Sequence, residues 1–127
     1  IIASAIFAIP AVKGIEFGAG FASSRMTGSE NNDEFYIDGD TVKTRTNNHG
    51  GILGGISSGM PITMNVAFKP TPSIARPQHT IDYQKSEDAV IEIKGRHDPC
   101  IVPRAVPCVE SVMGISILSS IGSSKTL

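Results

Sequence analysis

The sequence predicts a mixed α/β chain, with a helix near each end and short strands joined by hairpin-type turns between the helices. Apolar residues recur at helical spacing over residues 1–9 and again over residues 105–117. Between these stretches, several short runs alternate apolar and polar residues, which is typical of half-buried strands. The composition, with 40% hydrophobic and 18% charged residues, is that of a globular chain rather than a disordered one.

The first helix is expected over residues 1–9, and Pro10 ends it. No Ser, Thr, Asp or Asn precedes this helix as a cap, and the chain has no initiator Met. The apolar stretch is too short to span a bilayer and lacks the basic leading region of a secretory signal. We therefore expect further residues upstream of Ile1, and we treat residues 1–127 as a single partial domain.

Strands are expected wherever this alternation is bounded by turn-forming residues. One pair flanks Asp38-Gly39, a dipeptide suited to the positive φ values of a tight hairpin. In chain order, the strand candidates are Val12–Gly18, Phe35–Ile37, Thr41–Thr46, Ile62–Phe68, residues 79–84 and Ala89–Lys94.

The connections between these strands are expected to be long and mostly irregular. Gly20–Met26 can form a brief helical turn, whereas the polar run Thr27–Asp33 is expected to be a surface loop. Asn47–Gly55 has four glycines in nine residues, and Gly95–Pro107 has three prolines, so neither is expected to be regular. The last helix follows with Pro107 in its first turn, and the tail GSSKTL is expected to be irregular. Loops of this kind in a short chain are usually functional.

Charge and cysteine content exclude several partners. Eleven Lys and Arg against 12 Asp and Glu leave a net charge of −1, which provides no basic surface for nucleic acid. The two cysteines, Cys100 and Cys108, are interpreted as reduced thiols, which predicts a reducing, cytoplasmic compartment. No membrane partner is expected, because the leading apolar stretch is too short to span a bilayer. Together with His97 they are also candidate zinc ligands, with His49 or His79 as a fourth. Because their spacing does not match structural zinc sites, zinc is kept only as a weak alternative and no metal is expected.

Short motifs of other enzyme classes occur but lack their context. Gly55–Gly59 matches the G-x-S-x-G pattern of hydrolase nucleophile elbows, and His49-Gly50-Gly51 is similar to an oxyanion-hole motif. An elbow needs a strand before its serine and a helix after it, whereas here a glycine loop precedes and Pro61 follows. Gly18-Ala19-Gly20 lacks the third glycine of a dinucleotide fingerprint. Small residues in a tight loop are therefore the preferred interpretation.

The segment Lys69–Ser73, KPTPS, is the first that favours a ligand. It places a cation among two hydroxyl groups, and its prolines stiffen the backbone. A phosphate group requires a positive charge and several short donors, and a stiff segment loses little entropy on being ordered. The alternative is an ordinary loop at the end of a strand.

The segment Gly95–Cys100, GRHDPC, is the second segment that favours binding of a ligand. Consecutive side chains in a loop can converge on one ligand, and here they are a guanidinium, an imidazole and a carboxylate. Arg96 suits a carboxylate or phosphate of a substrate, and Asp98 suits proton transfer. A surface ion pair is the alternative interpretation.

Taken together and in order, five blocks of the sequence resemble the chorismate synthase family. Because they occur in the order of the family and with similar spacing, they are far more specific than any single motif. The blocks are IPAVKGIEFGAGF (Ile9–Phe21), RMTGSENND (Arg25–Asp33), TNNHGGILGGISSGMPI (Thr46–Ile62), AFKPTPSI (Ala67–Ile74) and GRHDPCIVPRAVPCVE (Gly95–Glu110).

The resemblance implies a carbon–oxygen lyase of the shikimate pathway to aromatic amino acids. Family members form chorismate from 5-enolpyruvylshikimate 3-phosphate by 1,4-trans elimination of phosphate, and they require reduced FMN. The implied fold is part of a β-α-β sandwich, in which antiparallel sheets cover central helices. The flavin-binding positions implied here are Gly54, Lys69, Pro70, Thr71, Pro72, Ser73 and Arg96. Arg96 is also implied in substrate binding, and Asp98 corresponds to a catalytic carboxylate near the flavin N5.

The resemblance covers the C-terminal portion of the family, so the chain alone is expected to be inactive. The two histidines, the arginine-rich substrate pocket and a further flavin contact of the family belong to its N-terminal portion. His49, His79 and His97 do not correspond to those histidines. The complete enzymes are homotetramers, and NADPH is a candidate reductant of the flavin. A non-catalytic flavin- or phosphate-binding module remains the alternative.

Overall fold

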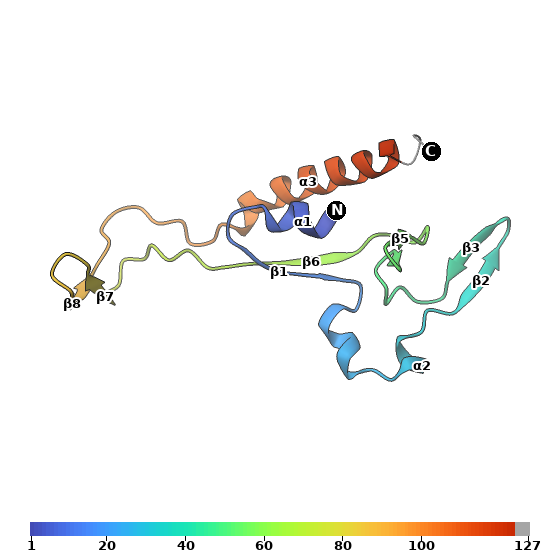
Figure 1. The fold of residues 1–127 in the computed structure, drawn as a ribbon, viewed down its shortest axis with the longest axis horizontal. Coiled ribbons are helices and arrows are strands. Elements are labelled where there is room, and N and C mark those ends of the chain that lie inside the picture. Colours follow the sequence, from blue (N-terminus) through green and yellow to red (C-terminus); the bar gives the residue numbers. More distant parts are fainter. Residues whose placement is uncertain (124–127) are drawn as a thin grey trace. The chain divides into compact units, whose positions relative to one another are not determined.

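A computed structural model describes residues 1–123 and divides the chain into two units. The first unit combines Ile1–Ala11 with Lys69–Leu127, and the second is Val12–Phe68. Figure 1 shows the mixture of helices and short strands along the chain. In the described part, the strands form four antiparallel pairs, so the predicted α/β class with hairpin-type strands is confirmed in outline.

The main ladder of the second unit joins β1 (Val12–Phe17) to β6 (Met64–Phe68). Both strands were expected from their alternating sequences, and they pair antiparallel with Phe17 opposite Met64. The register shifts between Val12 and Gly14, where the ladder is irregular. The side chain of Val12 is only 6% exposed and is the one buried apolar side chain described in this unit.

Two short helical segments follow β1. The expected helical turn is present as the 3-10 helix η1 (Gly20–Arg25). The polar run expected to be a loop instead contains a single helical turn, α2 (Gly28–Asn31). Its cause is a capping box, in which Thr27 accepts from the backbone of Glu30 and the Glu30 carboxylate accepts from the backbone of Thr27 at 2.7 Å.

The second unit also contains two hairpins. β2 (Phe35–Asp38) pairs with β3 (Thr41–Thr44), and Asp38 opposite Thr41 places the turn at Gly39–Asp40, one residue later than expected. The glycine-rich stretch expected to be irregular contains the second hairpin, β4 (Ile52–Leu53) with β5 (Ile56–Ser57). The prediction was wrong because Gly54 and Gly55, both with positive φ, form a tight turn between two short strands.

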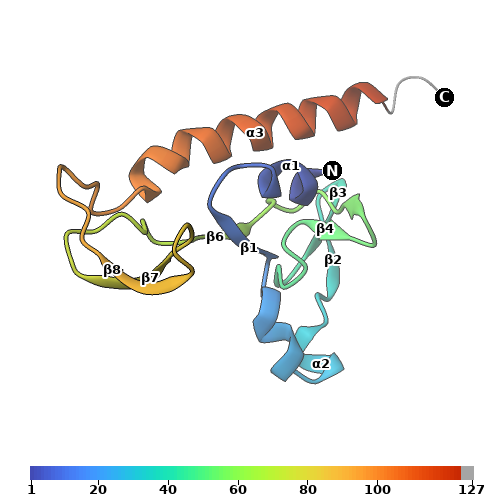
Figure 2. The ribbon, with the colours of Figure 1, turned by 60° about the vertical axis from the view of Figure 1, so that its left-hand side comes forward.

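In the first unit, α1 (Ile2–Phe7) packs against α3 (Val102–Ser123), as Figures 1 and 2 both show. The Ile6 side chain of α1 is fully buried. The helix α3 begins within the segment expected to be a proline-rich loop, so that expectation holds only before Val102. Pro103 lies in the first helical turn, where its missing N–H has no intrahelical partner to lose, and Pro107 lies inside the helix.

The surface of α3 is unusually apolar. Its exposed large apolar side chains are Val102, Val106, Ile115, Leu118 and Ile121. The stretch Val102–Gly122 has a mean hydropathy of 1.5, so within residues 1–123 it has the length and composition that would also allow a helix to cross a membrane. A helix that is apolar on most sides is equally typical of the centre of a larger protein core.

The first unit also contains the hairpin of β7 (Gln78–Asp82) and β8 (Glu87–Ile91), close to the two expected strands. This hairpin separates the Lys69–Ser73 segment from the Gly95–Cys100 segment along the chain. At the other end, α3 continues two residues into the expected irregular tail, and residues 124–127 lie outside the described part.

Candidate functional site

The Lys69–Ser73 segment leaves the ladder with its first residue anchored. The backbone N–H of Lys69 donates to the carbonyl of Ala11 at 2.8 Å. Lys69, Pro70 and Pro72 are exposed, whereas Thr71 and Ser73 are partly buried. The hydroxyl oxygen of Thr71 is buried and has no hydrogen-bond partner among residues 1–123. Leaving a buried hydroxyl without a hydrogen bond costs about 1 to 3 kcal/mol of stability. A ligand atom that formed a hydrogen bond with Thr71 would remove this cost, which favours binding.

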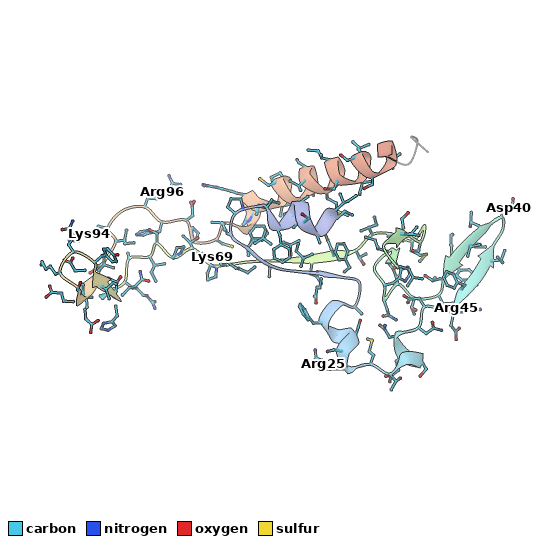
Figure 3. The ribbon with its side chains drawn as sticks, in the orientation of Figure 1. Arg25, Asp40, Arg45, Lys69, Lys94 and Arg96 are labelled. Atoms are coloured by element: carbon cyan, nitrogen blue, oxygen red, sulfur yellow. The ribbon has the colours of Figure 1, made fainter. Side chains whose placement is uncertain are left out.

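The second segment begins at Gly95, whose φ of +135° is readily adopted only by glycine. Arg96 is exposed, and Figure 3 shows its side chain on the outer side of its loop, away from Lys69. The carboxylate of Asp98 accepts from the guanidinium of Arg104 at 3.0 Å, and Arg104 belongs to the first turn of α3. The ion pair considered as an alternative for this segment is therefore present, formed by Asp98.

One side-chain contact joins the two segments. The hydroxyl of Ser73 lies 3.1 Å from Nδ1 of His97, and Nε2 of His97 lies 3.0 Å from the carbonyl oxygen of Ile93. Because a carbonyl can only accept, Nε2 carries the proton that is donated to Ile93. In the neutral ring, Nδ1 is then an acceptor, and Ser73 donates to it. The structure thus brings together Ser73 and the loop of Arg96 and Asp98.

Gly54 belongs to the second unit, at the turn between β4 and β5. Its φ is +60°, and a Cβ built at this position meets no atom within 4 Å. By contrast, a Cβ at Gly51, with φ of +79°, would lie 2.5 Å from the carbonyl oxygen of Pro61. The backbone of Gly54 is therefore open to a close approach by another molecule, whereas Gly51 is closely packed against the chain.

A partly buried hydrogen-bonded chain of Asp33, His49 and Ser58 lies in the second unit and was not expected from the sequence. The Asp33 carboxylate accepts from Nδ1 of His49, and Nε2 of His49 lies 2.7 Å from the hydroxyl of Ser58. The side chains of His49 and Asp33 are 7% and 8% exposed. The only sequence signal for this chain is the adjacency of His49 to the glycines, because the sequence predicts a surface loop at Asp33.

Asp33 accepts several further hydrogen bonds. The Thr46 hydroxyl donates to it at 2.5 Å, and the backbone N–H groups of Asn48 and His49 donate at 2.8 Å each. Burial alone would raise the pKa of Asp33, but hydrogen bonds from Thr46, His49 and Asn48 outweigh it and hold the pKa well below its usual range. Asp33 is therefore ionised at neutral pH, and its hydrogen bonds hold Thr46, Asn48 and His49 in place before the β4–β5 hairpin.

Asp33, His49 and Ser58 are connected in the same way as the Asp, His and Ser of a serine hydrolase triad, but the surrounding elements differ from those of a hydrolase. The serine that contacts His49 is Ser58, whereas the motif would use Ser57, which is exposed at the end of β5. No helix directly follows either serine, since Pro61 and β6 come next. The hydroxyl of Ser58 also accepts from the backbone of Met60 at 3.4 Å. Chemically, the chain ties the end of the glycine hairpin to Asp33.

Neither a cluster of metal ligands nor a cavity points to another site within the described residues. Within residues 1–123, no group of three or more His, Cys, Asp or Glu side chains could hold a metal ion. Cys100 and Cys108 are free and exposed. An open hollow of about 400 Å³ lies on the β7–β8 hairpin, but none of the predicted site residues lines it; those that do are Ile81, Tyr83, Ser86, Glu87 and Asp88.

Comparison with known proteins decides the family. The sequence profile described as chorismate synthase matches residues 1–121. This chain belongs to the chorismate synthase family. The resemblance found in the five sequence blocks is thereby confirmed.

Individual relatives agree. Chorismate synthases of Korarchaeum cryptofilum and Archaeoglobus fulgidus are 53% and 56% identical to this chain, over 120 and 114 residues that cover 94% and 90% of it. Chorismate synthase 2 of Solanum lycopersicum, a chloroplastic protein, is 54% identical over 121 residues. The chain spans about a third of the length of these relatives, with 33%, 32% and 28% of each covered.

A crystal structure of chorismate synthase is also similar to this fold. It matches with a TM-score of 0.55 and 45% sequence identity, over 57% of this chain and 22% of that chain. The matched part of this mixed helix and strand fold, 57% of the chain, is therefore similar to the fold of a chorismate synthase. The complete β-α-β sandwich needs more chain than the matched part, so it remains a proposal for this protein.

Proposed function

We propose that this chain forms the C-terminal portion of a chorismate synthase and supplies part of its flavin site. The proposed reaction converts 5-enolpyruvylshikimate 3-phosphate into chorismate by 1,4-trans elimination of phosphate, within the shikimate pathway. Besides family membership, one observation carries this proposal: the contact between Ser73 and His97 brings the lysine segment beside the loop of Arg96 and Asp98. Ser73 of the first segment thereby lies beside the loop that carries Arg96 and Asp98, and we propose that both segments face one ligand.

The residues of the lysine segment fit the phosphate of FMN. Lys69 offers an exposed positive charge, and the buried Thr71 hydroxyl without a protein partner in residues 1–123 offers a donor. Pro70 and Pro72 restrict the backbone, so little entropy is lost when an anion orders the segment. Ser73 completes the proposed set at the point where the second loop joins. Phosphate recognition of this kind needs several donors in a short stretch, which this segment provides.

Gly54 and Arg96 are proposed to contact the rest of the ligands. An open glycine with positive φ allows a flat ring system to approach the backbone of the β4–β5 turn. Arg96 has no ion pair recorded among residues 1–123, so its guanidinium is available for the flavin or for an anionic group of the substrate. Both roles follow from matching positions of the family.

Asp98 is proposed as the catalytic carboxylate. Reduced FMN, when bound, would supply the electron density that eases departure of the phosphate. The elimination also releases a proton from the substrate, and a carboxylate beside the reacting groups can accept or guide it. Only one oxygen of Asp98, Oδ2, is bonded to Arg104, so Oδ1 is the atom proposed to handle that proton.

The setting of the complete protein is proposed from the family as well. We infer a homotetramer in the cytoplasm, with NADPH as a candidate reductant of the flavin and central helices covered by antiparallel sheets. The isolated chain is proposed to be inactive. A non-catalytic flavin-binding module is the competing function, and the pairing of Asp98 with Arg104 is the observation that favours it.

The test uses the full-length gene product. It should form chorismate and release phosphate from 5-enolpyruvylshikimate 3-phosphate when reduced FMN is present. Lys69→Ala should weaken FMN binding by about tenfold or more, because one charge-assisted contact to phosphate is lost. Lys13→Ala, which removes an exposed lysine of β1, is the matched control and should leave FMN affinity unchanged. FMN binding without any chorismate formation would support the module instead.

A further inference from the structure

The contact between Ser73 and His97 has a consequence for anion binding that depends on one proton. In the neutral state derived above, the Ser73 hydroxyl proton points to Nδ1 of His97, because Nε2 already donates to Ile93. A hydroxyl group has one proton only. Ser73 then faces any further ligand with lone pairs, which repel a phosphate oxygen instead of binding it.

Protonation of His97 reverses this hydrogen bond. With both ring nitrogens carrying protons, Nδ1 donates to the Ser73 oxygen, while Nε2 continues to donate to Ile93. The Ser73 hydroxyl proton is then free to be donated to an anion, and the imidazolium adds a positive charge beside it. The reversal requires one added proton on the ring, and neither ring nitrogen changes its partner.

We propose that His97 is a positioning residue that switches Ser73 from acceptor to donor, so that a phosphate monoester binds the Lys69–Ser73 segment together with one proton from solvent. The proton is taken up at Nδ1 of His97, and no covalent bond is formed or broken in the ligand. This inference rests on the proposed function, since it assumes that the phosphate of FMN is the group that binds there. The proposed function above assigns no role to His97, so this role is additional to it.

The charged groups around the contact leave His97 as the group that responds. Asp98 is already paired with Arg104, and no hydrogen bond from another charged side chain to Ser73 or His97 is recorded among residues 1–123. The charged residues nearest in the chain to the three contact partners are Arg96 and Asp98 beside His97, Glu92 and Lys94 on either side of Ile93, and Lys69 and Arg76 before and after Ser73. These cations remain charged throughout the pH range considered, so they add attraction for the anion without a pH dependence of their own.

The decisive measurement is the number of protons taken up when FMN binds the full-length gene product. Calorimetric titrations in buffers of different ionisation enthalpy give this number directly. We expect net proton uptake when FMN binds, and an affinity that decreases as pH rises, by at most about tenfold per pH unit for one linked proton. Riboflavin, which has no phosphate, should bind more weakly and without uptake.

Variants separate the switch from a purely structural role. His97→Gln should remove the proton uptake, because the glutamine amide does not titrate, and should make FMN affinity independent of pH above pH 7. Ser73→Ala should also abolish the uptake, whereas Ser73→Thr, which keeps the hydroxyl, should restore it. His79→Gln removes an exposed histidine of β7 and should change nothing.

A second readout needs no ligand. Nitrogen NMR of the ligand-free protein should show the neutral His97 ring protonated at Nε2, and the opposite tautomer would overturn the proposal. FMN that binds with no uptake, or with uptake that persists in His97→Gln, would overturn the switch but leave the proposed function standing. A failure of FMN to bind at all would overturn both.

Discussion

At the scale of single residues, Asp98 carries the sharpest catalytic proposal, and its ion pair with Arg104 makes it testable. The carboxylate accepts from Arg104 at 3.0 Å and is itself 38% exposed. A carboxylate can be present to hold the start of α3, to handle a proton, or for both reasons. The two roles differ in what they do to turnover and to flavin affinity.

Asp98→Ala should therefore lower kcat of the full-length gene product by about 100-fold or more while changing the FMN dissociation constant less than about threefold. The reason is that proton transfer contributes to the transition state, whereas flavin binding does not require this carboxylate. Steady-state kinetics and flavin titrations measure the two effects. Arg104→Gln breaks the same ion pair but keeps the carboxylate, so equal losses in both variants would assign the effect to the ion pair and contradict the catalytic role.

Asp33 is the residue on which the local order of the second unit depends. Its carboxylate accepts from Thr46, Asn48 and His49, and its pKa is lowered because these hydrogen bonds outweigh burial, which would raise it. A carboxylate with a lowered pKa in the folded state stabilises the fold at every pH above its unfolded value, near 3.8. That contribution is lost as pH falls below this value toward the folded pKa.

Asp33→Asn should reduce the free energy of unfolding at pH 7 by about 3 kcal/mol, because it removes a buried, hydrogen-bonded charge. The difference from the unsubstituted protein should stay constant from pH 7 down to about pH 5 and shrink below about pH 4. Glu34→Gln changes the neighbouring, 70% exposed carboxylate and should alter stability by less than about 0.5 kcal/mol. Urea unfolding at several pH values measures the stability of both variants. If the stability difference between Asp33→Asn and the unsubstituted protein grew in acid, the predicted pH dependence would be wrong.

At the scale of elements, the β4–β5 hairpin presents two consecutive glycines that differ only in their proposed contact with flavin. Gly54 and Gly55 have φ of +60° and +84°, and a Cβ at either position meets no atom within 4 Å. Each substitution by alanine is therefore strained by the backbone alone. The pair forms its own matched control.

Gly54→Ala and Gly55→Ala should each cost about 1 to 2 kcal/mol of stability, the usual cost of a left-handed conformation for a residue with a Cβ. Only Gly54→Ala should weaken FMN binding, by about tenfold, because its methyl group would occupy the space proposed for the ring system. Thermal unfolding and flavin titration of the full-length gene product measure the two effects. Equal affinities in the two variants would remove Gly54 from the flavin site.

The elements that could be predicted from the sequence are those whose pattern repeats over several residues. Alternation identified β1, β6, β7 and β8, and apolar spacing identified both helices. The missed elements are short: α2 depends on a reciprocal cap between Thr27 and Glu30, and β4–β5 on a glycine turn between two-residue strands. The early start of α3 was missed because proline was taken to exclude helix, although a first helical turn tolerates it.

The candidate site likewise has features that could be predicted from the sequence and features that could not. Lys69–Ser73, Arg96 and Asp98 could be proposed as site residues from residue type together with the family resemblance, and their roles stay a prediction. The contact between Ser73 and His97 could not, because it depends on how the chain returns after the β7–β8 hairpin. The chain of Asp33, His49 and Ser58 was hidden for the same reason, since its members are separated in sequence and joined only by folding.

At the scale of the whole molecule, each unit has little apolar core of its own. Among residues 1–123, Ile6 is the buried apolar side chain of the first unit and Val12 that of the second. The exposed apolar residues of α3 belong to a chain that spans about a third of the length of its relatives. A helix that is apolar on most sides needs other chain segments against it, and we infer that the remaining part of the family fold provides them.

The 127-residue chain expressed alone should consequently form no chorismate from 5-enolpyruvylshikimate 3-phosphate with reduced FMN. It buries too little apolar surface for a stable core, and the exposed face of α3 should drive self-association at micromolar concentration. Light scattering and a phosphate-release assay measure the two effects. Ile115→Lys together with Leu118→Lys should reduce the self-association of the isolated chain but abolish folding of the full-length gene product, because there the same face would be buried. A monomeric, active isolated chain would show that these 127 residues already form a complete site.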